Sequence, residues 1–230
     1  MLPLSTQSIS SRQTSVFHTL IAQAIFALGM SMTGLAVQAA TMTATVVDKA
    51  STPMADVVIY ATAIGATTTP TFVNPDPVTI SQEGMQFSPY VTPVRVGTAI
   101  RFPNYDRIEH HVKSFSPAKQ FEIKIYESGT PPPVVFDKSG VAVIYCLLHE
   151  WMRAYVYVID TPYFSKSDLT GTASINGLKE GMYEIRAWHP DMGSIKPPLL
   201  QTIKVSEKGI TPVSFNFDFL PKKRKPPKQN

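Results

Sequence analysis

The sequence predicts an all-β protein, and three observations lead to this prediction. Short runs rich in β-branched and aromatic residues recur along the chain from Thr41 onward. Gly and Pro separate these runs, and the 20 prolines outnumber the 12 glycines, which disfavours long helices. The composition is 43% hydrophobic and 17% charged, as expected of a chain with a packed core. Many short strands at close spacing favour a β-sandwich.

The expected strands follow one another in order. The first alternates through Thr43–Asp48 and meets a polar turn, and Gly97 and Gly140 mark later turns. The segment Ala118–Tyr126 is compatible with a short helix. The remaining expected strands are Val57–Ala61, Val78–Ser81, Thr92–Val96, Ala99–Phe102, His111–Phe115, Val134–Asp137, Val141–Cys146, Arg153–Asp160, Thr172–Ile175, Gly181–Trp188, Leu200–Val205 and Thr211–Phe217.

Residues 1–39 have the pattern of an export signal. A Ser/Thr-rich start with Arg12 as its only charge leads into an apolar run, and Val37-Gln38-Ala39 places small residues at the cleavage positions. We predict a Sec-type signal peptide cut after Ala39, and a protein that is periplasmic or otherwise exported. An uncleaved membrane anchor is the alternative. No later stretch is apolar and long enough to span a bilayer, so no stable membrane insertion is expected after cleavage.

The positive net charge of +4 comes from the C-terminal end of the chain. Residues 220–230 contain five basic residues and no acid: Lys222, Lys223, Arg224, Lys225 and Lys228. The charge therefore does not indicate a nucleic-acid-binding surface, and no nucleic acid partner is expected. We expect a basic, disordered tail, with docking to an acidic partner or to anionic lipid as the alternative.

Candidate metal ligands lie close together in one segment. Cys146 is the only cysteine, so it has no internal disulfide partner, and a bound metal would protect its thiol in an oxidising compartment. Cys146, His149 and Met152 recur every three residues after a β-run, a spacing that lets a compact loop turn all three inward. One more imidazole completes a His₂Cys set with a thioether, which is typical of electron-transfer copper. Zinc prefers four strong ligands, and one cysteine excludes an iron–sulfur cluster.

This pattern resembles the cupredoxin family, the type 1 blue copper proteins. Cys-x-x-His-x-x-Met is similar to the second ligand loop of that family, at the spacing of amicyanin. Phe102-x-Asn104, followed six residues later by His110, resembles the first ligand segment, and the stretch Met85–Ile100 resembles the opening strands. The chain is most similar to plastocyanin-like proteins of the periplasm, some of them described as methylamine-utilisation proteins. The resemblance implies a Greek-key β-sandwich and one copper ion, Cu(I)/Cu(II), held by His110, Cys146, His149 and Met152.

The resemblance selects His110 over its neighbour His111, because adjacent strand residues point to opposite faces. His111 is then expected to hydrogen-bond across the ligand loops or to titrate near neutral pH. Asn104 is expected to tie the two ligand loops together by hydrogen bonds. An apolar docking patch around the edge of His149 is implied, with core packing as the alternative for its members: Leu147, Leu148 and Trp151.

Two further stretches resemble a second β-sandwich family. Thr43–Ala61 has the form strand, Asp, turn, Pro, strand, and Ser167–Trp188 contains Asp-Leu-Thr-Gly and then Leu-Lys-Glu-Gly-Met-Tyr. Both are similar to transthyretin-like or carboxypeptidase-regulatory-like β-sandwiches. We therefore predict a cupredoxin domain at residues 66–160, inserted into a discontinuous carboxypeptidase-regulatory-like β-sandwich of residues 41–65 and 161–219.

The implied function is the transfer of single electrons between redox protein partners, such as a cytochrome c or a dehydrogenase. A copper carrier or store and a structural sandwich with a vestigial site are the alternatives. No enzyme is expected, because no nucleophile–base motif is present and protein fills all the copper positions. His189 and Met192 could imitate a second metal site, but a surface turn is favoured there.

Overall fold

The structure, a computed structural model, is all-β over the residues that it describes, as the sequence predicted. These are residues 40–65, 75–207 and 209–224, and they lie within one compact unit, Gln38–Asn230. Their only helical element is a 3₁₀ turn, η1 (Pro190–Met192), where His189 accepts a hydrogen bond from the amide of Asp191. In the described part of the chain no helix has the length and apolar character needed to cross a membrane. The predicted signal peptide, residues 1–39, lies outside the described residues.

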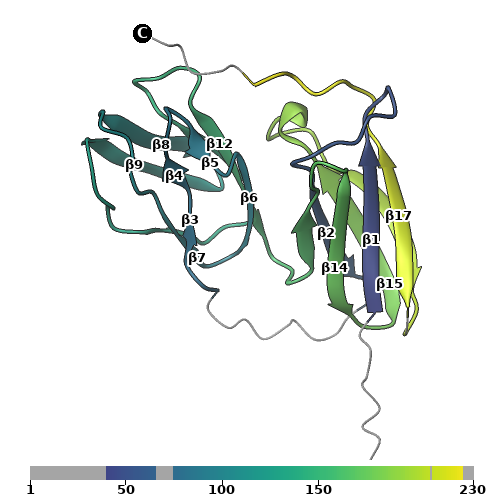
Figure 1. Cartoon of the computed structure of the whole chain (residues 1–230). Helices are drawn as coiled ribbons and strands as arrows, with labels where there is room; N and C mark the ends of the chain where they lie inside the picture. The colour runs from purple at the N-terminus through teal and green to yellow at the C-terminus, as the bar shows by residue number, and fades with distance from the viewer. Residues whose placement is uncertain (1–39, 66–74, 208, 225–230) are drawn as a thin grey trace, which may run out of the picture. The chain divides into compact units, whose positions relative to one another are not determined.

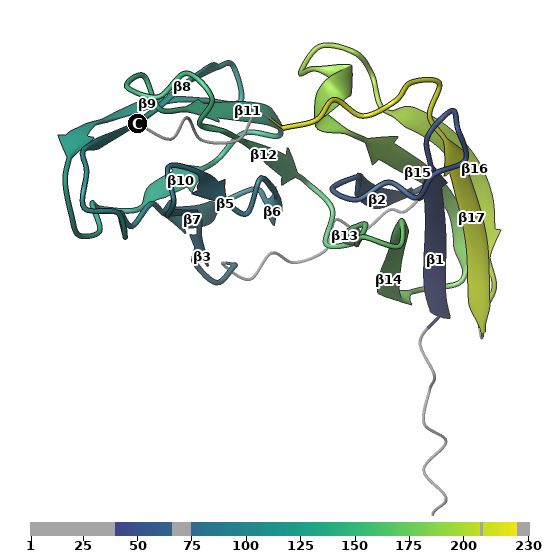
Figure 2. The ribbon, with the colours of Figure 1, turned by 45° about the horizontal axis from the view of Figure 1, so that its top comes forward.

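The strands between Val78 and Ile159 form two sheets and a short hairpin (Figure 2). The larger sheet has the order β6-β12-β11-β8-β9, in which β6 and β12 are parallel and the other pairs antiparallel. The smaller sheet has the order β10-β7-β3, and β4 pairs with β5. The bounds are β3 (Val78–Thr79), β4 (Ser81–Gln82), β5 (Phe87–Ser88), β6 (Val91–Arg95), β7 (Thr98–Arg101), β8 (His110–Ser116), β9 (Lys119–Tyr126), β10 (Val134–Phe136), β11 (Gly140–Tyr145) and β12 (Arg153–Ile159).

The strands before residue 66 pair with strands after residue 163. One sheet has the order β14-β1-β17 (Figure 1), with β1 antiparallel to β14 and parallel to β17. The other has the order β13-β2-β15-β16. The bounds are β1 (Ala40–Val47), β2 (Val58–Ala63), β13 (Phe164–Lys166), β14 (Thr172–Leu178), β15 (Gly181–Trp188), β16 (Leu199–Val205) and β17 (Ile210–Asn216). The division into an inserted and a discontinuous domain stays a prediction, which limited proteolysis would test.

Strand β12 separates two hydrophobic cores. Because successive side chains of a strand point to opposite faces, its residues divide between them. Ala154, Val156 and Val158 pack in the core of the 78–159 sandwich. Tyr155 and Tyr157 join the core built from strands β1, β2, β14, β15 and β17, where both rings contact Trp188 edge-on. Every residue of β12 except Arg153 is buried, so this strand contributes to both cores.

Two sequence-based expectations differ from the structure. The segment around Ala118–Tyr126 is strand β9 and contains no helix. Its side chains alternate between partly buried and exposed, which is the period of a strand that pairs along one edge with β8. Strand β13 was not expected from the sequence, and its three residues pair with β2.

The basic C-terminal segment is described only as far as Arg224, and residues 225–230 lie outside the description. Leu220 and residues 221–224 have no regular secondary structure, yet they contact the folded body. The amide of Lys222 donates to Asp191, and the Arg224 guanidinium pairs with Asp56 at 2.6 Å. The described part of the predicted disordered tail is thus held by specific contacts.

Candidate metal centre

The two segments that carry the candidate ligands meet because β8 and β11 are neighbours. His110 is the first residue of β8, and Cys146 directly follows the last residue of β11. The strands are antiparallel, with Tyr145 opposite Lys113, so the start of β8 lies beside the end of β11. The amide of His111 points at Cys146 Sγ over 3.5 Å. Strand pairing therefore places a histidine from one segment next to the cysteine of the other.

Three ligand atoms converge at this point. Cys146 Sγ lies 3.9 Å from His110 Nδ1 and 3.4 Å from His149 Nδ1, and the two Nδ1 atoms are 3.2 Å apart. His110 and Cys146 are buried, and His149 is partly exposed. The rings of His110 and His149 meet edge-on, with centroids 5.0 Å apart. The structure thus brings together three of the predicted ligands around one position.

The spacing of these atoms fits one transition-metal ion. Bonds of about 2.0–2.1 Å to imidazole and about 2.3 Å to thiolate separate neighbouring donors by roughly 3.3–3.8 Å at tetrahedral to trigonal angles. The three measured separations, 3.2, 3.4 and 3.9 Å, need changes of only a few tenths of an ångström to meet this range. A thiolate with two imidazoles is a soft donor set that suits copper.

Met152 closes the loop that carries Cys146 and His149. The amide of Cys146 donates to the Met152 carbonyl at 3.2 Å, and the amide of Met152 donates to the His149 carbonyl at 2.9 Å. The Met152 side chain is 1% exposed and packs in the same core as Cys146. These bonds fold the seven-residue loop back on itself and hold the predicted thioether at its end.

Asp106 is a residue of this site that the sequence analysis missed. Its carboxylate lies 2.8 Å from His110 Nε2 and accepts hydrogen bonds from the amides of Gly84 and Met85 at 2.7 and 2.9 Å. A carboxylate on one ring nitrogen fixes the ring and leaves the other nitrogen for the metal. The sequence offered one signal, an acidic residue four positions before a candidate ligand histidine. It gave no sign of the amides of Gly84 and Met85, because they come from a distant turn.

The pKa directions of Cys146 and His149 agree with a metal-binding role, whereas that of His110 favours its protonated form. Burial opposes ionisation of Cys146, yet hydrogen bonds from His110 and from nearby backbone amides outweigh it and lower the pKa of the thiol. Burial likewise opposes a charged His110, but its bonds with Cys146 and Asp106 raise the pKa of the imidazole. Burial and the charge of His110 lower the pKa of His149. Without a metal the site therefore favours a thiolate beside a neutral His149, the forms that bind metals, and metal binding would displace a proton from His110.

Asn104 stabilises the first segment in a different way from the one expected. Its amide nitrogen donates to three carbonyls, those of Ile108, Tyr126 and Glu127, and its side-chain oxygen accepts from the amide of Asp106. None of these partners belongs to the 146–152 loop, so Asn104 does not tie the two ligand segments together. It joins the His110 segment to the end of β9, because its side chain points toward that strand.

His111 lies outside the cluster of ligand atoms. Its Nε2 is 2.8 Å from Glu122 on the paired strand β9, and Lys113 binds the other oxygen of that carboxylate. The register of β8 and β9 shifts between His110 and Val112, so an irregularity occurs where the two histidines diverge. His111 contributes its backbone amide to Cys146, while its side chain contacts the neighbouring strand rather than the ligand loops.

The three predicted docking residues differ in exposure. Leu147 and Leu148 are 56% and 45% exposed, as a contact surface requires. Trp151 is only partly exposed: its Nε1 donates to the Met85 carbonyl, and its ring lies 5.4 Å from that of His149. Trp151 therefore packs against the site, and Leu147 and Leu148 form the exposed apolar surface beside it.

Comparison with known proteins finds structural likeness only. No protein-family model matches the chain, and no curated protein matches it. A solved amicyanin variant with Cu(I) matches 36% of this chain and 81% of its own, at 16% identity and a TM-score of 0.33. A purple cupredoxin from Nitrosopumilus maritimus matches 36% of this chain and 99% of its own, at 24% identity and a TM-score of 0.33. At these identities the likeness concerns the fold alone.

A third match corrects the expectation that the chain is not an enzyme. A copper-containing nitrite reductase from Thermus scotoductus matches 50% of this chain at 22% identity and a TM-score of 0.35, over 28% of the reductase. An enzyme therefore occurs among the solved structures that this chain matches in part. A metal site whose ligand positions are all filled by protein side chains does not exclude catalysis. The expectation that this chain is not an enzyme was therefore wrong.

The strand arrangement places the candidate ligands at the ends of neighbouring strands of one sandwich. A larger and a smaller sheet enclose one core, with His110 opening one central strand and Cys146 following its neighbour. The part of the chain that carries His110, Cys146 and His149 is a β-sandwich, and the solved structures that it matches include cupredoxins.

Proposed function

We propose that this chain is a type 1 copper protein that carries single electrons between redox partners. The observation that carries the proposal is the cluster of His110, Cys146 and His149, whose ligand atoms all lie within 4.8 Å of one another. Copper bound there would supply a one-electron couple between Cu(I) and Cu(II). Met152, buried at the end of the same loop, is the proposed fourth and weak ligand.

The surrounding residues hold the ligands in a fixed arrangement. Asp106 orients the His110 ring, and Asn104 fixes the turn from which Asp106 projects. The amide of His111 donates toward the sulfur, which stabilises negative charge on the thiolate. A site that is rigid before metal binding needs little rearrangement when its charge changes, and this favours rapid electron transfer.

His149 is the proposed route for electrons into and out of the site. It is the only member of the three-residue cluster that is partly exposed. Leu147 and Leu148 lie beside it in sequence and are exposed, so they offer apolar contact to a partner. The proposed partner is a redox protein such as a cytochrome c or a dehydrogenase. An exported location, proposed from the pattern of residues 1–39, would keep Cys146 in need of a protecting metal.

Reconstitution of the purified chain with Cu(II) tests this proposal. We expect one copper ion per chain, an intense blue to green colour from thiolate ligation, and full recovery of the colour after a cycle of reduction and oxidation. The measurements are metal analysis, the visible spectrum and voltammetry.

Other outcomes would favour other functions. Tight binding of colourless Cu(I), without a reversible couple, would support a copper carrier or store. The absence of stoichiometric binding would leave a structural sandwich, and either result would contradict the electron-transfer proposal.

A further inference from the structure

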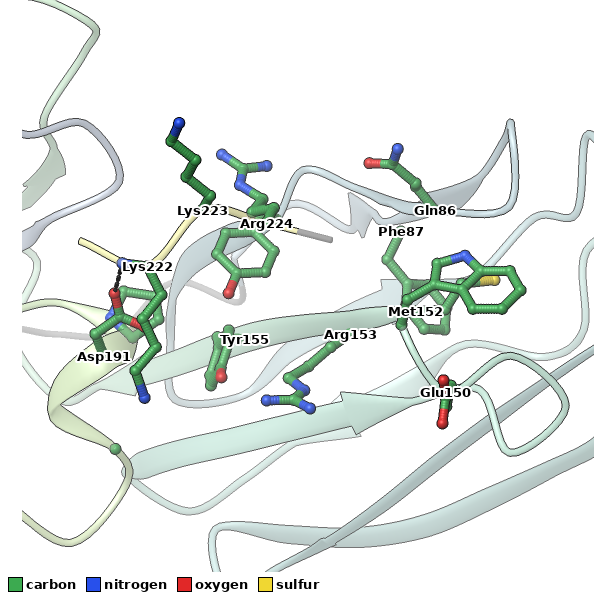
Figure 3. A pocket seen from close by; sticks show the side chains of 14 residues that line it. Gln86, Phe87, Glu150, Met152, Arg153, Tyr155, Asp191, Lys222, Lys223 and Arg224 are labelled. Atoms are coloured by element: carbon green, nitrogen blue, oxygen red, sulfur yellow. Dashed lines mark hydrogen bonds between the residues drawn. The ribbon is translucent and has the colours of Figure 1, made fainter. Parts of the chain in front are cut away.

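A cavity of about 400 Å³ lies beside the metal-ligand loop (Figure 3). The loop supplies part of one wall, through Trp151 and Met152, and strand β12 supplies Arg153 and Tyr155. The described C-terminal segment supplies basic residues. The full lining is Gln86, Phe87, Tyr90, Glu150, Trp151, Met152, Arg153, Tyr155, Pro190, Asp191, Gly193, Lys222, Lys223 and Arg224. The volume falls within the range of small-molecule sites, about 300–1,000 Å³.

Aromatic rings held by packing form much of this lining. Tyr155 is 7% exposed, and its ring meets that of Tyr90 edge-on at 5.4 Å. Phe87 is 4% exposed, and Trp151 is held by its hydrogen bond to the Met85 carbonyl. Rings in fixed positions offer flat apolar contact at little entropic cost. The cavity is thus preformed for a planar group.

Basic residues of the C-terminal segment border the cavity. The segment is held by the Lys222 amide on Asp191 and by Arg224, which pairs with Asp56 and lies over the Tyr90 ring at 4.1 Å. Among the described residues, the side chains of Lys222 and Lys223 have no hydrogen bond or ion pair. Figure 3 shows Lys223 and Arg224 projecting side by side. The Lys222 side chain runs to the other side of the segment, so the Lys223 ammonium group is the unpaired cation beside Arg224.

The charges of the lining favour an anion. Four cationic side chains, Arg153, Lys222, Lys223 and Arg224, face two acidic ones, Glu150 and Asp191. Asp191 already accepts the Lys222 amide, and Arg224 is already paired. Lys223, which projects beside Arg224, remains as the cation best able to bind a carboxylate.

We propose that this cavity binds a small planar organic anion of the aromatic carboxylate class. Its ring would lie against Tyr90, Tyr155 and Trp151, and its carboxylate would bind Lys223, which projects beside Arg224. The ligand would then contact Trp151, whose ring lies 5.4 Å from that of His149. The proposal does not depend on copper, so it holds for the metal-free chain as well.

Titration with 2-naphthoate tests the proposal directly. We expect saturable binding of one molecule per chain by calorimetry, with and without copper. Lys223→Glu should weaken it about tenfold, because one attractive charge becomes repulsive. Lys204→Glu is the matched control: Lys204 is exposed on β16 outside the lining and undergoes the same charge change. This control should bind 2-naphthoate as the unchanged chain does.

Three results would overturn the proposal. Equal weakening by Lys204→Glu would reveal a general charge effect, and equal affinity for neutral 2-naphthamide would show that no anion is recognised. Binding of a poly-glutamate peptide without binding of 2-naphthoate would make this surface a docking face for an acidic macromolecule. Because the readout is binding to chains with and without copper, a failure here leaves the electron-transfer proposal standing.

Discussion

The two segments that carry the candidate ligands hold these ligands in position in opposite ways. Residues 146–152 place three candidate ligands within one short loop, which needs only two backbone hydrogen bonds to close. Residues 104–110 contribute one ligand, His110, and surround it with many more bonds. Asn104 bonds four backbone groups, and Asp106 bonds two amides and the imidazole.

This difference shows what fixes the position of each candidate ligand. Ligands that are close in sequence are brought together by the loop itself. A ligand that comes from a distant strand needs a scaffold, and here the scaffold consists of polar side chains that never reach the metal. We expect substitutions in the two segments to have different consequences: loss of the metal or a changed reduction potential in the loop, and loss of stability or affinity in the scaffold.

The largest expected effect comes from the loop. Cys146→Ala removes the only thiolate, so the visible band should vanish and copper affinity should fall by more than about 100-fold, beyond a typical outer-shell loss. Absorption spectroscopy and metal analysis measure both. The control is His111→Asn, which changes the neighbour of a ligand and should keep the colour. A coloured Cys146→Ala protein would show that the ligand assignment is wrong.

The next effect concerns stability. Asn104→Ala removes the four part-buried hydrogen bonds of this side chain, and a typical bond of this kind contributes about 0.5–1.5 kcal/mol. We expect the free energy of unfolding of the metal-free chain to fall by about 3 kcal/mol, as measured by urea denaturation. Asn176→Ala, which removes an exposed side-chain contact with Thr41, is the control and should change stability little. An Asn104→Ala chain of unchanged stability would contradict the scaffold role.

Asp106 should influence affinity more than folding. Asp106→Asn keeps the shape of the side chain but removes the charge that orients His110. Copper affinity should fall about 10- to 100-fold, the usual cost of losing an outer-shell partner. A competition titration with a chelator measures this. Asp137→Asn, at an exposed carboxylate paired with Lys119, is the matched control and should leave affinity unchanged. Equal losses in the two variants would mean that net charge alone matters.

The smallest effect is expected at the end of the loop. Met152→Leu conserves volume in a buried position, so stability should change by less than about 1.5 kcal/mol. The chain should keep copper and its colour, with a shifted reduction potential, because the weak axial ligand tunes the potential. Voltammetry measures the shift. An unchanged potential would indicate that Met152 is not a ligand.

The sequence predicted the local features of this molecule well. The all-β fold, most strand positions and the Cys-x-x-His-x-x-Met loop follow from alternation, turn residues and spacing, which involve neighbours in sequence. Strand β9 was not expected because its Lys and Glu residues are poor strand formers, and only its pairing with β8 settles its conformation.

The features that the sequence did not predict depend on contacts between distant residues. The role of Asp106 depends on the amides of Gly84 and Met85, and the partners of Asn104 lie at the end of β9. A single sequence gives no sign that these groups come within hydrogen-bonding distance. The same holds for the cavity, whose lining joins residues near position 90 with residues near position 223.

Strand β12 has a consequence for how this protein unfolds. Because Ala154, Val156 and Val158 belong to one core and Tyr155 and Tyr157 to the other, neither core can lose this strand alone. Thermal unfolding of either sandwich therefore removes β12 from both cores. Unfolding of the 78–159 sandwich, for example, also exposes the other core around Trp188. Calorimetry should therefore record a single peak, and a metal bound at one end should protect the entire chain against thermal denaturation.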